Sequence, residues 1–103
     1  MDRITQLKGF LESQPNDAFL NHALALEYRK LEQWEDALKQ FVFNQTTNPT
    51  YVGTYYHLGQ LYELIGEEDK AIETYQIGMK HAMAQNETHA YGELRSVYEE
   101  LTF

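Results

Sequence analysis

Histidine is the residue in this chain whose side chain offers the widest chemistry, because imidazole ligates metals and transfers protons near neutral pH. Two ligands that share one metal on a helix lie about four residues apart. The four histidines, His22, His57, His81 and His89, include no pair at a spacing of three or four residues. The sequence therefore predicts no metal site and no catalytic base.

Other catalytic motifs are absent as well. The chain has no cysteine, no glycine-rich phosphate loop, no nucleophile motif and no paired carboxylates. We therefore expect a protein that is not an enzyme and has no cofactor. The lack of cysteine suits a reducing compartment, and the first residues lack the apolar run of a signal peptide. Since no run of about 18 apolar residues could span a membrane, the simplest expectation is a soluble cytoplasmic protein.

The eight tyrosines raise the question of a ring-stacking ligand site. Five of them fall on the apolar faces of predicted helices, at Tyr28, Tyr55, Tyr62, Tyr75 and Tyr98. We expect these five to pack in the core. Tyr56 lies one residue off that face, which leaves two alternatives open: contact with a partner, or exposure to solvent.

Helices must position these side chains, because apolar residues recur every three or four residues along the whole chain. We predict six helices and no strand. They run from Ile4 to just before Pro15, from Asn16 or Asp17 to about Leu31, from Trp34 to Asn48, from Thr50 to Ile65, from Glu67 to a polar turn at residues 85–88, and from there to the end. Gly66 is expected to end the fourth helix in the left-handed conformation.

The sequence also matches itself, without a gap, at a lag of 34 residues. The first copy has Leu24, Ala25, Tyr28, Leu31, Ala37 and Phe41, and the second has Leu58, Gly59, Tyr62, Ile65, Ala71 and Tyr75. A repeat of this length is typical of helical solenoids, which stack their units and present an extended surface. Paired helices approach closely where one offers a small residue to a ring of the other. We expect this role for Ala25, Ala37, Gly59 and Ala71.

These residues resemble the tetratricopeptide repeat (TPR), a unit of about 34 residues with a Leu-Gly pair, a following Tyr, an Ala in its second helix and a closing Pro. Residues 52–85 match best, through Tyr55, Leu58, Gly59, Tyr62, Gly66, Ala71, Tyr75 and the small Gly78. Residues 18–51 match with three departures. Asn21 replaces the first aromatic residue, Glu32 replaces the turn glycine, and Asn44 occupies the second small position.

The resemblance implies an all-α fold in which antiparallel helix-turn-helix repeats stack into a right-handed superhelix, an α-solenoid of about six helices. It implies a single TPR-like domain over residues 1–103. Within that domain we expect an N-terminal half repeat (2–14), two repeats (18–51 and 52–85) and a C-terminal half repeat or cap (88–103).

In this family the first helix of each repeat lines a concave groove that binds partners. The matching positions here are His22, Leu26, Arg29 and Lys30, then Tyr56, Gln60, Glu63 and Leu64, then Gly92, Ser96, Glu99 and Glu100. Members that bind the carboxylate of a chaperone tail use Lys and Asn one helical turn apart in the first repeat. This chain departs from that pattern, since it has His22 and Leu26 there and Gln60 in place of the second repeat's Asn.

The implied partner is a protein or peptide held in this groove. Nucleic acid is not expected, because the basic residues are scattered and outnumbered by acidic ones, five to seven in residues 1–51 and three to nine in residues 52–103. No membrane partner is expected either. The alternative is a structural, self-associating protein, a weak homodimer rather than a monomer. This alternative depends on terminal helices that leave four apolar residues partly open: Ile4, Leu7, Val97 and Leu101.

Overall fold

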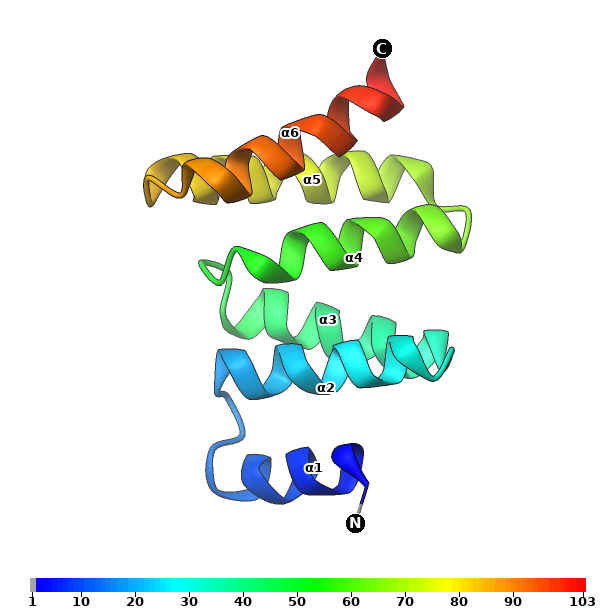
Figure 1. Cartoon of the computed structure of the whole chain (residues 1–103), viewed down its shortest axis with the longest axis vertical. Helices are drawn as coiled ribbons and strands as arrows, with labels where there is room; N and C mark the ends of the chain where they lie inside the picture. Colours follow the sequence, from blue (N-terminus) through cyan, green and yellow to red (C-terminus); the bar gives the residue numbers. More distant parts are fainter. Residues whose placement is uncertain (1) are drawn as a thin grey trace. The chain divides into compact units, whose positions relative to one another are not determined.

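Six α-helices account for the regular structure of the protein (Figure 1). The computed structural model describes residues 2–103. The helices are α1 (Arg3–Ser13), α2 (Ala18–Lys30), α3 (Trp34–Thr47), α4 (Gly53–Leu64), α5 (Glu68–Ala84) and α6 (Thr88–Thr102). Residues 2–103 contain no strand and no helix that is both long and apolar enough to cross a membrane. The prediction of an all-α protein of six helices is confirmed.

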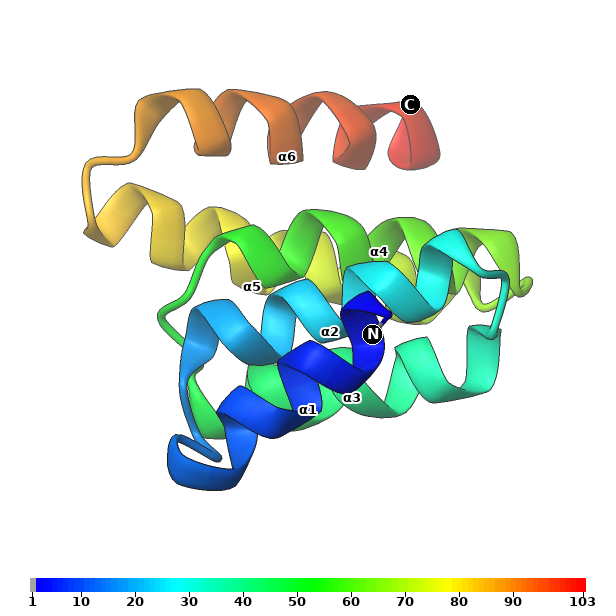
Figure 2. The ribbon, with the colours of Figure 1, turned by 60° about the horizontal axis from the view of Figure 1, so that its bottom comes forward.

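The helices form two compact units, of which the first ends at Tyr51 and the second is Val52–Phe103. In the first unit α2 packs against α1 and α3, and in the second α5 packs against α4 and α6. α4 also contacts α6. The chain reverses direction between α2 and α3 and again between α4 and α5 (Figures 1 and 2). Each unit is therefore an antiparallel helix pair with one additional helix.

Aspartate side chains begin the first two helices. Asp2 Oδ1 accepts a hydrogen bond from the Thr5 backbone N–H at 2.7 Å, and Asp17 Oδ1 accepts one from the Leu20 N–H at 2.8 Å. Such a cap satisfies a helical donor that has no partner within the helix. The Thr5 N–H also lowers the pKa of the Asp2 carboxyl, because it stabilises the ionised form. Of the two residues predicted to begin the second helix, Asn16 and Asp17, the structure selects Asp17.

Several predicted helix boundaries are wrong: the helices expected to begin at Ile4 and Glu67 begin one residue away, at Arg3 and Glu68, and two further differences occur at turns. The fourth helix begins at Gly53 rather than Thr50, because residues 48–51 form a turn closed by a backbone hydrogen bond of 3.0 Å. Thr88, assigned to a polar turn, is instead the first residue of α6, because the turn ends at Glu87.

Three turn residues have a left-handed backbone: Gly66 (φ 84°), Glu32 (φ 60°) and Asn86 (φ 58°). The prediction for Gly66 is confirmed. Glu32 stands at the same place in the preceding repeat and keeps the conformation without being a glycine. This conformation costs a residue with a side chain roughly 1–2 kcal/mol. The first repeat thus carries a strain that the second repeat avoids.

Small residues facing rings build the core of each unit. Ala25, Ala37 and Ala71 have no exposed surface, as predicted. Gly59 is so close to the Tyr75 ring that a Cβ on it would lie 2.2 Å from Tyr75 Cε1. The α4–α5 pair therefore requires glycine at this position.

Of the five tyrosines assigned to the core, two are fully buried and three are half-buried. Tyr55 and Tyr75 are buried, whereas the half-buried rings are Tyr28, Tyr62 and Tyr98. Lysines cover two of the partly open rings, because Lys8 Nζ and Lys70 Nζ each lie 5.9 Å from the ring centroids of Tyr28 and Tyr62, respectively. Tyr62 and Tyr98 nevertheless pack against the core of the second unit, so the core role predicted for them is confirmed although they are only partly buried.

Four apolar side chains of the terminal helices were expected to lie partly open, and one of them is fully covered. The prediction that Leu7 lies partly open is wrong, since it is only 1% exposed where α1 packs on α2. Ile4, Val97 and Leu101 are partly buried, as expected.

Buried amide side chains tie the first unit together near the start of α2. Asn21, which is 1% exposed, donates to the backbone carbonyls of Pro15 (3.1 Å) and Asp17 (2.8 Å). Its own carbonyl accepts a hydrogen bond from Gln40 Nε2 on α3 at 2.5 Å. One side chain thus connects the α1–α2 loop, α2 and α3.

Two further asparagines extend this network from α3. Asn44, which is fully buried, donates to the Ala18 carbonyl at 3.1 Å. Asn48 Nδ2 donates to Asn44 Oδ1 and to the Asn16 carbonyl, at 2.9 Å in each case. The carbonyls of three successive loop residues, 15–17, therefore accept hydrogen bonds from side chains.

The second unit fills the same repeat positions with a ring and a glycine. Tyr55 and Gly78 stand 34 residues after Asn21 and Asn44. A Cβ on Gly78 would lie 2.5 Å from Tyr55 Cβ and 3.1 Å from Leu94 Cδ1. Helices α4, α5 and α6 therefore meet at this glycine.

Candidate peptide-binding surfaces

The predicted groove residues of the first unit all lie on α2. Three of them, His22, Leu26 and Lys30, line a cavity of about 300 Å³. The rest of its lining is Arg3, Phe19, Ala23 and Glu27. Arg3 Nε and Glu27 Oε1 form an ion pair of 3.9 Å between α1 and α2. Since Phe19 is 60% exposed, the cavity combines an apolar wall with a mixed charged rim.

Two predicted residues of α2 are less accessible than a groove position suggests. The His22 side chain is buried, with its ring centroid 6.0 Å from that of Phe41 and 5.3 Å from that of Tyr51. Arg29 is not among the residues that line the cavity, and its Nε is buried without a hydrogen-bond partner among the described residues. Leu26 and Lys30 are therefore the predicted residues of α2 that both have an accessible side chain and line the cavity.

A larger cavity of about 570 Å³ lies where α1 meets α2, and of the predicted groove residues only Lys30 lines it. Its lining is Asp2, Arg3, Ile4, Thr5, Lys8, Glu27, Tyr28, Lys30, Leu31, Gln33 and Asp36. Three basic and three acidic residues balance each other there. This cavity therefore favours no ligand of a particular charge.

The second unit has a cavity of about 540 Å³ between α4 and α6. Four of the positions expected to line the groove are brought together there: Tyr56, Gly92, Ser96 and Glu100. The other lining residues are Thr88, His89, Glu93 and Val97. Tyr56 also lines a neighbouring cavity of about 240 Å³. Its half-buried ring thus borders two cavities and is not simply exposed to solvent.

Gln60 and Glu63, two other predicted groove residues, make hydrogen bonds next to this cavity. Gln60 Nε2 donates to Tyr56 Oη at 3.2 Å, and Tyr75 Oη donates to Glu63 Oε2 at 2.5 Å. Burial raises the pKa of Tyr75, and the hydrogen bond to Glu63 and the nearby charges of Tyr56 and Glu100 raise it further. Gln60 therefore supports the cavity wall through Tyr56, whereas Glu63 is bonded to a buried core ring, and neither is part of the lining.

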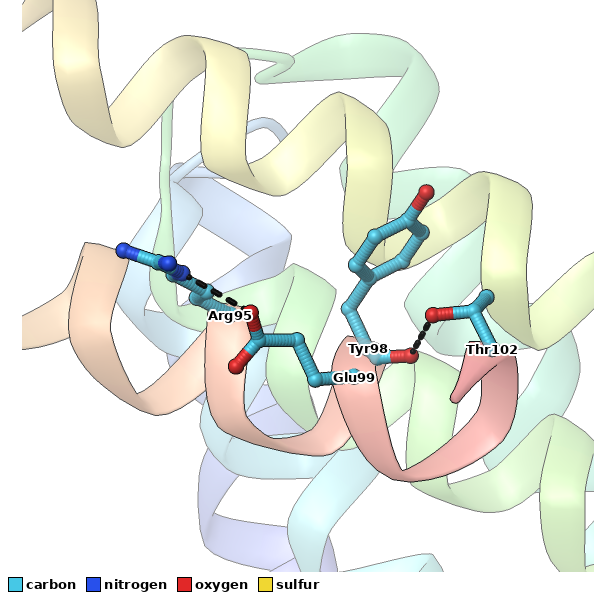
Figure 3. A network of polar contacts seen from close by, with 4 residues as sticks. All are labelled: Arg95, Tyr98, Glu99 and Thr102. Atoms are coloured by element: carbon cyan, nitrogen blue, oxygen red, sulfur yellow. Dashed lines mark hydrogen bonds and ion pairs between the residues drawn. The ribbon is translucent and has the colours of Figure 1, made fainter.

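Glu99 and Leu64 line neither of the two cavities beside Tyr56. Arg95 Nε donates to Glu99 Oε2 at 3.1 Å, one turn away on α6 (Figure 3). In the same view the Thr102 hydroxyl donates to the Tyr98 carbonyl at 2.9 Å. Leu64 is 56% exposed near the end of α4. The groove positions of Glu99 and Leu64 thus remain predictions, without a cavity beside them.

Four cavity residues of α6 were not predicted from the sequence: Thr88, His89, Glu93 and Val97. The signal that could have found them is helical periodicity, because residues 89, 93, 96, 97 and 100 share one face of the helix. The family resemblance compares positions between repeats, whereas the cavity follows the face that α6 turns toward α4.

The cavity between α4 and α6 is acidic. Glu93 and Glu100 line it, and no Lys or Arg is found among its described lining residues. His89 Nε2 lies 3.6 Å from Glu93 Oε1, with the two side chains 92% and 54% exposed. Across residues 2–103 no group of three or more His, Asp or Glu side chains is placed to hold a metal ion.

Comparison with known proteins identifies the family. No family model matches the chain, and no curated protein matches it significantly. The crystal structure of a tetratricopeptide repeat domain protein from Salinibacter ruber is 38% identical, with a TM-score of 0.80, over 84% of this chain and 96% of that one. A solution NMR structure from the same organism, with the same description, is 39% identical, with a TM-score of 0.81, over 84% and 88% of the two chains. The chain belongs to the tetratricopeptide repeat family.

This TPR protein shares its fold with more distant structures as well. The TPR2B domain of yeast Sti1, solved as a complex with pHsp70, has a TM-score of 0.88 at 17% identity, over 96% of this chain and 79% of that one. At this identity the similarity concerns the fold alone. The resemblance based on the 34-residue lag is thereby confirmed, together with the all-α helical repeat fold.

Proposed function

We propose that this TPR protein is a non-catalytic interaction module that binds a peptide or a segment of another protein on surfaces lined by α2, α4 and α6. Membership of the TPR family supports the proposal, and so does the related fold of the yeast Sti1 domain, which was solved as a complex with pHsp70. The observation that carries it is the cavity of about 540 Å³ beside Tyr56. Cavities of this size accept the side chains of a bound segment.

The proposed contact residues are those that the cavities expose. On α2 they are Leu26 and Lys30, and in the second unit they are Tyr56, Gly92, Ser96 and Glu100. The remaining predicted groove residues are assigned to the rim or to support of the surface: His22, Arg29, Gln60, Glu63, Leu64 and Glu99. An adaptor of this kind needs no cofactor, and the absence of cysteine suits a reducing compartment such as the cytoplasm.

Gly92 offers a direct test of the proposal. A Cβ on Gly92 meets nothing within 4 Å, and the residue lines the cavity. Gly92→Trp is therefore expected to fill the cavity without disturbing the core. Gly9→Trp is the matched control, since Gly9 is also helical, exposed and open around its Cβ position.

The measurement is affinity capture from a lysate of the source organism, with identification of the bound proteins by mass spectrometry. We expect Gly92→Trp to lose proteins that both the wild type and Gly9→Trp retain. Identical captures by the three proteins would contradict the proposed function.

Self-association is a second candidate function, and exposed apolar side chains favour it. Phe103 is 94% exposed and Phe10 is 56% exposed, next to the partly buried side chains of the terminal helices. A second copy covering these side chains would form a weak homodimer. Sedimentation equilibrium over a wide range of concentrations should then show a mass that rises with concentration. A constant monomer mass would remove this candidate.

A further inference from the structure

Neither Lys nor Arg occurs among the described residues that line the cavity between α4 and α6, although residues 52–103 include three of them. Lys70 lies over the Tyr62 ring, and Arg95 is paired with Glu99. Lys80 is on α5 and does not line the cavity. None of the three Lys and Arg side chains of the unit therefore lies in the cavity lining beside Glu93 and Glu100.

Two carboxylates, Glu93 and Glu100, line this cavity. They lie seven residues apart on α6, or about 10 Å along the helix axis. Glu100 forms no ion pair with any described residue, and the described ion-pair partner of Glu93 is His89, which carries charge only when protonated. Two carboxylates are thus available in the lining of one cavity.

Tyr56 adds an aromatic ring to these carboxylates. Its hydroxyl accepts a hydrogen bond from Gln60, and Tyr56 lines two neighbouring cavities, of about 540 and 240 Å³. Carboxylates form short, strong hydrogen bonds with ammonium and guanidinium groups, and a tyrosine ring attracts a cation over its face. A metal ion is a poorer match, since residues 2–103 contain no cluster of ligands for one.

We propose that the α4–α6 cavity binds a lysine or arginine side chain from a basic segment of the partner protein. This inference rests on the proposed function and specifies the chemistry of the partner. One of the two carboxylates, Glu93 or Glu100, pairs with the cation, and the Tyr56 ring packs against its aliphatic stem. An excess of carboxylates distinguishes this cavity from the cavity of about 300 Å³ on α2, whose lining has two cations, Arg3 and Lys30, and one carboxylate, Glu27.

Short labelled peptides of defined sequence test the proposal. The probes are a peptide of repeated Arg-Ser-Leu, the same peptide with citrulline in place of arginine, and the same peptide with glutamate there. Citrulline keeps the shape of arginine but removes the charge. By fluorescence anisotropy at low salt, we expect the arginine peptide to bind at least tenfold more tightly than the citrulline peptide, and we expect salt to reduce this advantage.

Two double variants assign the effect to the cavity. Glu93→Gln with Glu100→Gln should weaken binding of the arginine peptide about tenfold and leave the citrulline peptide unchanged. Glu68→Gln with Glu73→Gln removes the same charge from exposed positions of α5 outside the cavity, and should change binding less than twofold. Circular dichroism verifies that the variants remain helical. In NMR spectra the backbone amides of Gly92 and Ser96 should shift when the arginine peptide binds.

Several results would overturn the inference: equal affinity for the arginine and citrulline peptides, equal losses in the two double variants, or no binding of any peptide. Preferred binding of the glutamate peptide, with shifts at Gly92, would overturn it and leave the proposed function intact. The proposed function fails separately, if Gly92→Trp leaves the captured proteins unchanged.

Discussion

In the first unit α2 and α3 are joined at Asn21 and Asn44 by hydrogen bonds, whereas in the second unit α4 and α5 meet at the same repeat positions through the Tyr55 ring and Gly78. The amide arrangement depends on how the asparagine side chains are oriented, because each buried N–H must have a hydrogen-bond acceptor. The ring arrangement depends on shape, because a Cβ on the glycine would collide with the ring. The residue at the first position of each repeat therefore limits the residue at the second. Next to the Tyr55 ring only glycine fits, whereas the smaller side chain of Asn21 is combined with a second asparagine, Asn44.

A second pair of positions differs in the same coupled way. The buried ring of the first unit is Phe41, and Arg29 stands one helix away with its Nε buried and without a hydrogen-bond partner among the described residues. At the same repeat positions the second unit has Tyr75, whose hydroxyl donates to Glu63. The hydrogen bonding of a predicted groove residue such as Glu63 therefore depends on whether the buried ring of its repeat carries a hydroxyl. This limits how far groove residues can be compared between repeats.

Gly78→Asn, which places the asparagine of the first unit at the same position of the second unit, is expected to have the largest effect on stability. Its Cβ would lie 2.5 Å from Tyr55 Cβ, and such overpacking should lower the free energy of unfolding by about 3 kcal/mol. Urea unfolding followed by circular dichroism measures this loss. Adding Tyr55→Asn removes the obstructing ring, so the double variant should be less destabilised than the sum of the two single variants. Strict additivity would contradict the coupling of the two positions.

Breaking the amide network of the first unit should have the next largest effect. Asn21→Ala leaves Gln40 and the Pro15 carbonyl without their partner in a site that is 1% exposed, and should lower the free energy of unfolding by about 2 kcal/mol. Asn16→Ala is the control, because Asn16 is exposed, and a change within about 0.5 kcal/mol is expected for it. Equal small changes for both variants would show that the network contributes little.

Alkaline pH sharpens the comparison of Tyr75 with Phe41. Because the pKa of Tyr75 in the folded protein is raised above its ordinary value of 10.0, the unfolded chain loses this proton first as the pH rises. The stabilising contribution of Tyr75 is thus complete below pH 10 and declines above it, by up to about 1.4 kcal/mol per pH unit.

Tyr75→Phe, which copies the first unit, should therefore make the free energy of unfolding less sensitive to pH above 10. Near neutral pH it should cost about 1 kcal/mol, because the hydrogen bond to Glu63 is lost. Urea unfolding at neutral and alkaline pH measures both effects. An unchanged dependence on alkaline pH would show that Tyr75 titrates normally.

The turn after the first helix of each repeat provides the smallest expected effect. Glu32→Gly copies Gly66 and relieves the strain of φ 60°, partly offset by the greater freedom of glycine in the unfolded chain. We expect a gain of about 0.5–1 kcal/mol in the free energy of unfolding, seen as a melting temperature a few degrees higher. The reverse change, Gly66→Ala, should lower it by a similar amount. A lower melting temperature for Glu32→Gly would mean that its side chain stabilises the turn.

Most of the fold could be predicted from the sequence, because helical periodicity and a 34-residue lag are properties of the chain itself. Ala25 and Ala37 are buried as predicted, and Gly66 has the predicted conformation. The errors at Thr50 and Thr88 have a common cause. Polar residues suit both a turn and the first turn of a helix, and the backbone hydrogen bonds that decide between them are not visible in the pattern.

The candidate site could be predicted less completely. Tyr56 and Ser96 line the cavity, as their repeat positions suggest. Glu63 and Glu99 occupy equivalent positions, but one is bonded to a side chain from another helix and the other to a neighbour one turn away. A comparison of positions between repeats does not include such neighbours. Glu93, a carboxylate of the acidic cavity, was missed for the same reason.

The network around Asn21 has a consequence for the attack of proteases on the protein. Exposed loops are the usual sites of cleavage, and a protease must draw several residues into an extended conformation before it can cut. In the α1–α2 loop the carbonyls of residues 15–17 are held by Asn21 and Asn48. Cleavage there requires these bonds to break first, so the loop should resist digestion for as long as the α2–α3 pair stays folded.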